Sequence, residues 1–168
     1  SGRALSVGGA ASPRACSAQK LALGNRTCII GPVSTPLRIA CIGCGARAQT
    51  YTHLAARRPD RFQIVAGADP VAERVEKIRR TVGHAGFRGF DSADALLAAG
   101  TLADVAIVAT QDNYHYDHCR RALEAGYHVL LEKPIATRVD QVLDIARTAR
   151  RLERRVMVCF VLRFAAFY

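Results

Sequence analysis

From Leu37 onward the sequence alternates between short apolar runs and amphipathic stretches. The apolar runs predict six strands, at residues 37–42, 62–68, 87–90, 104–109, 129–131 and 156–162. The stretches between them predict five helices, at 46–57, 71–82, 91–99, 114–125 and 138–152. Strands that alternate with helices pair in parallel and are covered on both faces. The pattern therefore predicts an α/β fold with a doubly wound parallel sheet of strand order 3-2-1-4-5-6.

The helix signals also predict local details. Asp91 is expected to cap the third helix, and Gly126 is expected to end the fourth. The apolar residues of the last helix predict its buried face, made of Val139, Val142, Leu143, Ala146 and Ala149.

A glycine-rich turn joins the first strand to the first helix. Its sequence is Gly43-Cys44-Gly45-Ala46-Arg47-Ala48. A G-x-G-x-x-G/A pattern is a weak signal by itself, but a strand before it and a helix after it are the context of a dinucleotide site. Gly43 would form the tight turn, and Gly45 would let the backbone approach a pyrophosphate at the helix N-terminus. The turn therefore predicts the Rossmann form of the sheet with a dinucleotide cofactor.

An acidic residue follows at the position that such a site requires. Asp69 ends the second predicted strand, 24 residues after Gly45. A carboxylate there accepts hydrogen bonds from the adenosine ribose and repels a 2′-phosphate. We therefore expect NAD as the cofactor. Arg74 follows nearby and would temper that preference, which leaves NADP as a second cofactor.

Composition and charge limit the other classes. The chain of 168 residues has a net charge of +10, but the first 36 residues contain no acid and a second basic cluster, Arg147 to Arg155, ends a predicted helix. The basic residues are thus not gathered in one patch, and aromatic residues are not interleaved with them. A nucleic-acid partner is therefore not favoured. No apolar run reaches 18 residues, so no membrane partner is expected.

Six cysteines raise the alternatives of disulfides, redox chemistry and metal binding. Cys41 and Cys44 form a C-x-x-C pair, but no second pair occurs, and a third ligand beside His115 and Cys119 is not evident. We therefore expect no metal, reduced thiols and a cytoplasmic location.

The first 36 residues differ from the rest of the chain. They are rich in Ser, Gly and Ala and lack periodicity, which predicts a disordered extension before a domain at residues 37–168. Their Arg and Ser content also fits an import signal for an organelle, and this alternative remains open.

The second half places further polar residues at strand ends. Thr110 and Gln111 follow the fourth strand, His115 begins the next helix, and Glu132-Lys133 follows the fifth strand. Ligands bind at the carboxyl ends of strands in such sheets, so these residues are expected in one crevice with Gly43. A lysine beside a glutamate there can donate to a substrate oxygen.

At this point the sequence resembles the Gfo/Idh/MocA oxidoreductases, which include glucose–fructose oxidoreductase and inositol dehydrogenase. The matching segments are Ile39–Ala48, Ala68–Pro70, Val108–His115, Ala122–Thr137 and Val158–Tyr168. The most specific is the run Ala122–Pro134, which contains Glu-Lys-Pro, while Thr110-Gln111-Asp112 departs from the more frequent Thr-Pro-Asn form.

The resemblance implies hydride transfer between a nicotinamide cofactor and a sugar, polyol or related alcohol. It implies that Lys133 binds the substrate hydroxyl and assists proton transfer. It also implies that Glu132 lines the nicotinamide ribose region, and that Thr110, Gln111 and His115 line the cofactor cleft.

Family members continue into a second α/β domain that supplies most substrate contacts. We therefore expect this chain alone to be incomplete as an enzyme, and a non-catalytic dinucleotide-binding module is the alternative. The resemblance leaves substrate identity open, and self-association into a homo-oligomer is an expectation for the full-length form.

Overall fold

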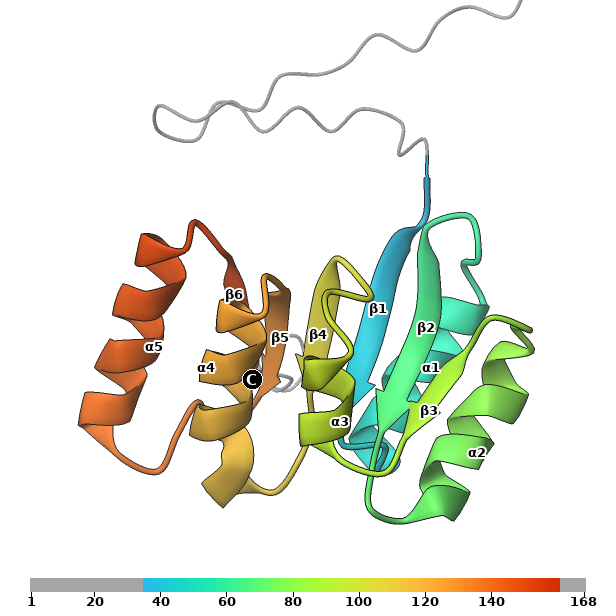
Figure 1. Ribbon diagram of the computed structural model, residues 1–168, viewed down its shortest axis with the longest axis horizontal. Coiled ribbons are helices and arrows are strands. Elements are labelled where there is room, and N and C mark those ends of the chain that lie inside the picture. The colour runs from blue at the N-terminus through green and yellow to red at the C-terminus, as the bar shows by residue number, and fades with distance from the viewer. Residues whose placement is uncertain (1–34, 161–168) are drawn as a thin grey trace, which may run out of the picture. The chain divides into compact units, whose positions relative to one another are not determined.

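The structure, a computed structural model, describes residues 35–160. Its centre is a six-stranded parallel sheet of order β3-β2-β1-β4-β5-β6 (Figure 1). The strands are β1 (Leu37–Ile42), β2 (Phe62–Ala68), β3 (Arg88–Phe90), β4 (Val105–Val108), β5 (His128–Glu132) and β6 (Val156–Cys159). The predicted doubly wound sheet and its strand order are confirmed.

Helices cover the sheet on its two faces. They are α1 (Ala46–Ala56), α2 (Ala72–Val82), α3 (Ala93–Ala98), α4 (His115–Glu124) and α5 (Val139–Arg151), and a 3₁₀ turn, η1 (Asp112–Tyr114), precedes α4. Two separate apolar clusters result, one under α1 and α2 and one under α3, α4 and α5. Helices α3, α4 and α5 lie on the near side of the sheet in Figure 1.

The alternation of side chains along the central strands explains this arrangement. In β1, Ile39 and Cys41 belong to the cluster under α1 and α2, whereas Ala40 and Ile42 belong to the other cluster. Successive strand residues point to opposite faces. A central strand that is apolar at both sets of positions is therefore covered on both sides.

The strand register places the functional loops at one edge. Ile42 is level with Ala68 of β2 and with Val108 of β4. Val108 is in turn level with Leu131 of β5. The loops that begin after these residues therefore lie side by side at the carboxyl edge of the sheet. After β1 the chain adds β2 and β3 on one side of that strand and then crosses over to β4 on its other side, so the strand order reverses between β1 and β4. Sheets of this kind bind ligands at this point.

Two local predictions are wrong. Ser92, not Asp91, caps α3, because the Ser92 hydroxyl accepts a hydrogen bond from the Ala95 N–H at 3.2 Å. The Asp91 carboxylate instead accepts a hydrogen bond from the Ser92 hydroxyl, and this adjacent pair competes with capping by Asp91.

The predicted buried face of α5 is also partly wrong. Ile145, Thr148 and Ala149 are buried, whereas Val139 and Leu143 are 76% and 50% exposed and Ala146 is exposed as well. Helix α5 carries apolar residues on two faces, and the side that meets α4 and the sheet is the one that contains Ile145. An apolar strip of Val139, Leu143 and Ala146 therefore remains on the surface of α5.

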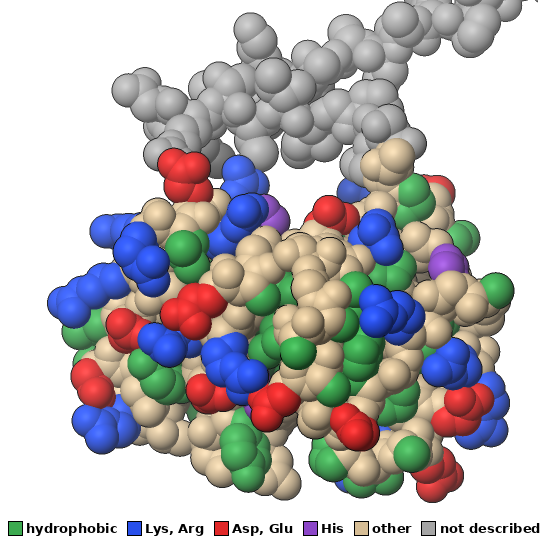
Figure 2. Space-filling view, in the orientation of Figure 1, with side chains coloured by type: hydrophobic (Ala, Val, Ile, Leu, Met, Phe, Trp, Pro, Cys, Tyr) green, Lys and Arg blue, Asp and Glu red, His purple; other side chains and the backbone are tan. Residues whose placement is uncertain are grey.

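Several predictions lie outside the described residues, namely those on the 1–34 part of the extension and on residues 161–168. Within residues 35–160, no helix is long and apolar enough to cross a membrane. On the face in Figure 2, Lys and Arg side chains are interspersed with Asp and Glu over α4 and α5.

Candidate functional site

The glycine turn after β1 is shaped by its neighbours. Gly43 has a φ of +85°, and a Cβ there would lie 2.7 Å from the Ala109 carbonyl oxygen. Its N–H donates to the Ala68 carbonyl oxygen at 2.9 Å, which fixes the turn against the end of β2. Gly43 is thus required by the protein itself, because any side chain would be strained and would meet backbone atoms.

Gly45 differs from Gly43 in its surroundings. It is the N-cap residue of α1 with an extended backbone (φ −69°), and within residues 35–160 no atom beyond its chain neighbours lies within 4 Å of the place where its Cβ would be. In the part of the chain that the structure describes, no side chain caps the N-terminus of α1, and the first turn of this helix contains no acidic residue. The first N–H groups and the positive end of the helix dipole are therefore available to an anion.

Asp69 links the end of β2 to this turn. Its side chain is 4% exposed, and Oδ2 accepts a hydrogen bond from the Cys44 N–H at 2.9 Å. Oδ1 accepts one from the Val71 N–H at 2.9 Å and lies 3.5 Å from Nη1 of Arg74. Two backbone donors thus hold the carboxylate beside the cavity that begins at the glycine turn.

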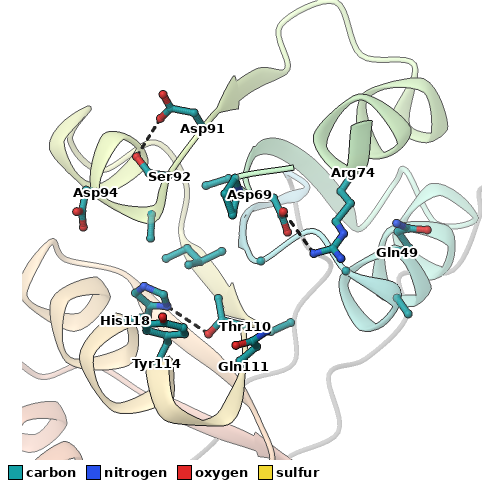
Figure 3. A pocket seen from close by; sticks show the side chains of 18 residues that line it. Gln49, Asp69, Arg74, Asp91, Ser92, Asp94, Thr110, Gln111, Tyr114 and His118 are labelled. Carbon is teal, nitrogen blue, oxygen red and sulfur yellow. Dashed lines mark hydrogen bonds and ion pairs between the residues drawn. The ribbon is translucent and has the colours of Figure 1, made fainter. Parts of the chain in front are cut away.

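The cavity at this edge has a volume of about 760 Å³, within the range of small-molecule and cofactor sites. Its lining comes from the loops after β1, β2, β3 and β4 and from the adjacent ends of α1, α2, α3 and α4. Gln49 and Arg74 lie on one side, and Thr110, Gln111, Tyr114 and His118 lie across from them (Figure 3). Of the predicted site residues, the cavity brings together Gly43, Gly45, Ala46, Asp69, Thr110 and Gln111.

His118 lines the cavity, although the sequence did not single it out as a site residue. Its Nδ1 lies 3.2 Å from Oγ1 of Thr110, and its ring stacks on Tyr114 with centroids 5.7 Å apart. Burial is the main cause that lowers the pKa of His118, and the imidazole is therefore neutral at pH 7. Tyr114 and His118 are four residues apart beside the fourth strand, and this spacing was the available signal.

Glu132 and Lys133 lie at the end of β5, outside the lining of that cavity. Glu132 is 5% exposed, and its Oε1 accepts a hydrogen bond from the hydroxyl of Tyr51 on α1. Nε of Arg47, also on α1, lies 3.4 Å from the same oxygen. The Lys133 side chain is exposed. Glu132 is therefore bound to α1, the helix that begins at the glycine turn, and the exposed side chain of Lys133 lies next to it.

Tyr51 is the second residue that sequence reasoning missed. Burial raises its pKa, and hydrogen bonds with Cys159 and Glu132 raise it further, so that the phenol remains a hydrogen-bond donor at neutral pH. Tyr51 and Glu132 are 81 residues apart in sequence, and no local pattern indicates that they meet.

His115 is 1% exposed and is not part of the cavity lining, although it was expected to line the cleft. Its Nδ1 lies 2.6 Å from the Pro134 carbonyl oxygen, and its Nε2 lies 3.2 Å from the Thr110 carbonyl oxygen. It thus links the loop after β4 to the loop after β5 from inside the protein.

The C-x-x-C pair lacks the features of a redox or metal site. Cys41 and Cys44 are free, fully buried thiols. Burial raises the pKa of Cys41, and it raises the pKa of Cys44 to about 12. Both thiols are therefore protonated at neutral pH, whereas the thiolate is the reactive and metal-binding form. Among residues 35–160 no group of three or more His, Cys, Asp or Glu could hold a metal ion.

Comparison with known proteins identifies the fold and its relatives. D-glucoside 3-dehydrogenase of Escherichia coli (strain K12) is 35% identical over 133 residues, which cover 79% of this chain and 37% of that protein. Inositol 2-dehydrogenase 3 of Saccharopolyspora erythraea is 31% identical over 133 residues, which cover 79% of this chain and 38% of that protein. The chain thus spans little more than a third of the length of these relatives.

A solved structure with the same fold is the WlbA dehydrogenase from Chromobacterium violaceum in complex with NADH and UDP-GlcNAcA. It matches with a TM-score of 0.68 and 28% identity over 77% of this chain and 37% of that chain. A family model described as an oxidoreductase family with an NAD-binding Rossmann fold matches residues 37–160, and it agrees with the predicted cofactor, NAD. The sheet, the glycine turn and Asp69 agree with that match, and the chain belongs to the Gfo/Idh/MocA oxidoreductase family.

Proposed function

We propose that this chain is the NAD-binding part of an oxidoreductase that transfers a hydride between a nicotinamide cofactor and an alcohol carbon of a sugar or polyol. The observation that carries the proposal is the carboxylate of Asp69, held beside the glycine turn at the edge of a cavity of about 760 Å³. The names of the relatives, a glucoside dehydrogenase and an inositol dehydrogenase, support the class of substrate.

The residues of the site fit a dinucleotide. The free N–H groups at the start of α1 would bind the pyrophosphate, and the open side of Gly45 would let it approach the backbone. Asp69 would accept hydrogen bonds from the adenosine ribose. When bound, NAD supplies the hydride acceptor.

We propose that Lys133 is the residue that binds the substrate oxygen and assists proton transfer. Its exposed side chain extends from the strand end next to β4, so its ammonium can donate a hydrogen bond to a substrate oxygen. In alcohol oxidation the Lys133 ammonium would orient the substrate oxygen and stabilise the negative charge that develops on it as the hydroxyl proton passes to solvent water. Glu132, whose carboxylate is bound by Tyr51, would support the same turn.

Isothermal titration calorimetry with NAD tests the binding step on the 168-residue chain. We expect saturable binding by the parent protein and a loss of at least about tenfold in affinity for Gly45→Val, whose side chain would occupy the approach of the pyrophosphate. Gly83→Asn at the end of α2 is the control for a glycine replaced away from the cavity, because asparagine tolerates the left-handed backbone there (φ +57°). Absence of NAD binding by a folded parent protein would refute the proposal.

The choice between NAD and NADP depends on two neighbouring charges. Asp69 is held by two backbone donors and repels a 2′-phosphate, whereas Arg74 would attract it. We propose that NAD binds more tightly and that Arg74 retains weaker binding of NADP. Calorimetry on Arg74→Gln should show a larger loss for NADP than for NAD, and an equal loss for both would contradict this role of Arg74.

Turnover is tested separately. The 168-residue chain is mixed with NAD and a panel of glucosides and inositols, and NADH formation is followed by absorbance. Steady NADH formation that is lost in Lys133→Met supports the oxidoreductase proposal for this chain. NAD binding without turnover instead supports the non-catalytic dinucleotide-binding module.

We also propose a reducing compartment, the cytoplasm, as the location. Cys41, Cys44 and Cys119 are buried free thiols within the cores of the domain. Oxidation of buried thiols would disturb the packing around them, and a reducing compartment avoids this. Fractionation of cells followed by immunodetection of the chain tests the location.

A further inference from the structure

We propose that Tyr51 and His115 are positioning residues for Lys133, holding the turn that carries it from two sides. The proposal rests on the proposed function, in which Lys133 handles the proton. It assigns a role to two residues that do not line the cofactor cavity. Tyr51 acts through the carboxylate of Glu132, and His115 acts through the backbone of Pro134.

The contacts on the side of Glu132 use both of its carboxylate oxygens. Oε1 accepts a hydrogen bond from the Tyr51 hydroxyl and lies 3.4 Å from Nε of Arg47. Oε2 lies 3.3 Å from the backbone N of Lys133, which donates to it. A carboxylate that is 5% exposed is stable only with such partners. The residue before Lys133 is therefore attached to α1, the helix that begins at the glycine turn.

The contacts on the side of Pro134 come from His115 on α4. The short distance of 2.6 Å from Nδ1 to the Pro134 carbonyl oxygen indicates that Nδ1 carries a proton and donates it there. Nε2 faces the Thr110 carbonyl oxygen at 3.2 Å. Thr110 lines the cofactor cavity, so the same imidazole contacts both the cavity loop and the turn of Lys133.

Together these contacts place Lys133 between two fixed neighbours. The preceding residue is held by a helix on one face of the sheet, and the following residue is held by a helix on the other. The side chain of Lys133 is exposed. The backbone from which the ammonium extends is therefore located by the same elements that form the dinucleotide site, as a preorganised proton donor requires.

The composition of the chain allows a direct readout at Lys133. The sequence contains three lysines, Lys20, Lys77 and Lys133. Reductive methylation with ¹³C-formaldehyde therefore gives three dimethyl-lysine signals in a carbon–proton NMR spectrum, and Lys133→Arg assigns the third. Lys77 is exposed on α2 and serves as the internal control.

We expect Tyr51→Phe to move the Lys133 signal and to leave the Lys77 signal in place, because Glu132 loses one of its donors. Tyr116→Phe is the matched control. It removes a tyrosine hydroxyl that donates to the Asp144 carboxylate at 2.9 Å, between α4 and α5. A Lys133 signal that moves equally in both variants, or in neither, overturns the role of Tyr51.

His115 is tested by a pair of variants. Asn keeps an amide donor near the position of Nδ1, whereas Leu removes it, so His115→Leu should move the Lys133 signal more than His115→Asn. Equal signals in the two variants overturn the role of His115. If His115→Leu does not fold, His115→Ala, which also lacks a donor, takes its place, and equal Lys133 signals in His115→Ala and His115→Asn overturn the role of His115.

NAD affinity of each folded variant is measured in parallel by calorimetry. For Tyr51→Phe, positioning of Lys133 predicts an NAD affinity within about twofold of the parent, because Tyr51 lies outside the lining of the cavity. Failure of the parent protein to bind NAD would refute the proposed function but would leave the Lys133 signals as a separate result. A displaced Lys133 signal with unchanged NAD affinity supports the positioning role alone.

Discussion

At the scale of single residues, the site depends on groups that serve the fold and the ligand at once. The carboxylate of Asp69 accepts hydrogen bonds from the N–H groups of Cys44 and Val71, and these bonds join the glycine turn to the end of β2. The same carboxylate lies at the cavity. Its substitution is therefore expected to affect folding and binding together, so glycines are the cleaner probes.

Gly43 and Gly45 should separate stability from binding. Gly43→Ala should lower the free energy of unfolding by about 1–3 kcal/mol, because φ is +85° and the Cβ would meet the Ala109 carbonyl oxygen. Gly45→Ala should leave it within about 0.5 kcal/mol, since its backbone is extended and its surroundings are open. Urea unfolding of both variants checks this, and an equal loss in both would contradict the distinction.

His118 should make stability depend on pH. Burial lowers its folded pKa below that of the unfolded chain, so the unfolded state binds a proton first as pH falls. The stabilisation is present above about pH 6.5 and is lost as pH falls through the folded pKa.

His118→Gln should therefore lose less stability than the parent between about pH 7.5 and about pH 5.5 in urea unfolding. The pKa of His128 is also lowered by burial and supplies a pH dependence that both proteins share. An identical pH dependence in parent and variant would exclude His118 as a source.

At the scale of elements, periodicity located the helices and strands but not every face. The prediction for α5 included Val139 and Leu143, which are exposed, and omitted Ile145, which is buried. Apolar residues lie on two sides of this helix, and only the packing of α4 and the sheet decides which side is covered. Likewise Asp91 and Ser92 are both good caps, and their mutual hydrogen bond leaves Ser92 in that role.

The two sides of α5 should respond differently to truncation. Ile145→Ala should cost about 2–5 kcal/mol, because its side chain is 3% exposed within the apolar cluster. Leu143→Ala, on the exposed strip, should change stability by no more than about 0.5 kcal/mol. Chemical unfolding of both variants measures the difference, and a larger loss for Leu143→Ala would show that the strip is covered in solution.

The candidate site was predictable where it depends on local sequence. The glycine turn, Asp69 and Thr110 follow directly from strand ends and spacing. The contacts of Glu132 with Tyr51 and of His115 with Pro134 were not, because they join residues 81 and 19 positions apart through the packing of α1 and α4 against the sheet. Sequence patterns specify which edge of the sheet is functional, and packing specifies which side chains meet there.

At the scale of the whole molecule, the sheet separates two apolar clusters. Ile78 of α2 belongs to one and Leu123 of α4 to the other, and both side chains are almost fully buried. Because the clusters lie on opposite faces of the sheet, residues in different clusters share no cavity. The molecule therefore has two cores that the strand backbones join.

Truncations in the two cores should be additive. Ile78→Ala and Leu123→Ala should each cost about 2–5 kcal/mol, and the double variant should lose their sum within about 0.5 kcal/mol. Urea unfolding supplies the three values, provided that the double variant still folds. A coupling of more than about 1 kcal/mol between Ile78 and Leu123 would show that the sheet transmits repacking between its faces.

The open space beside Gly45 has a consequence for the evolution of this protein. Among residues 35–160, no atom beyond its own chain neighbours lies within 4 Å of its missing Cβ, so this part of the fold imposes no selection for glycine there, whereas the backbone around Gly43 does. In lineages that keep the cofactor, both glycines should persist. In lineages that have lost it, Gly45 should drift to other residues while Gly43 stays, so that the pair records whether the ancestral ligand is still bound.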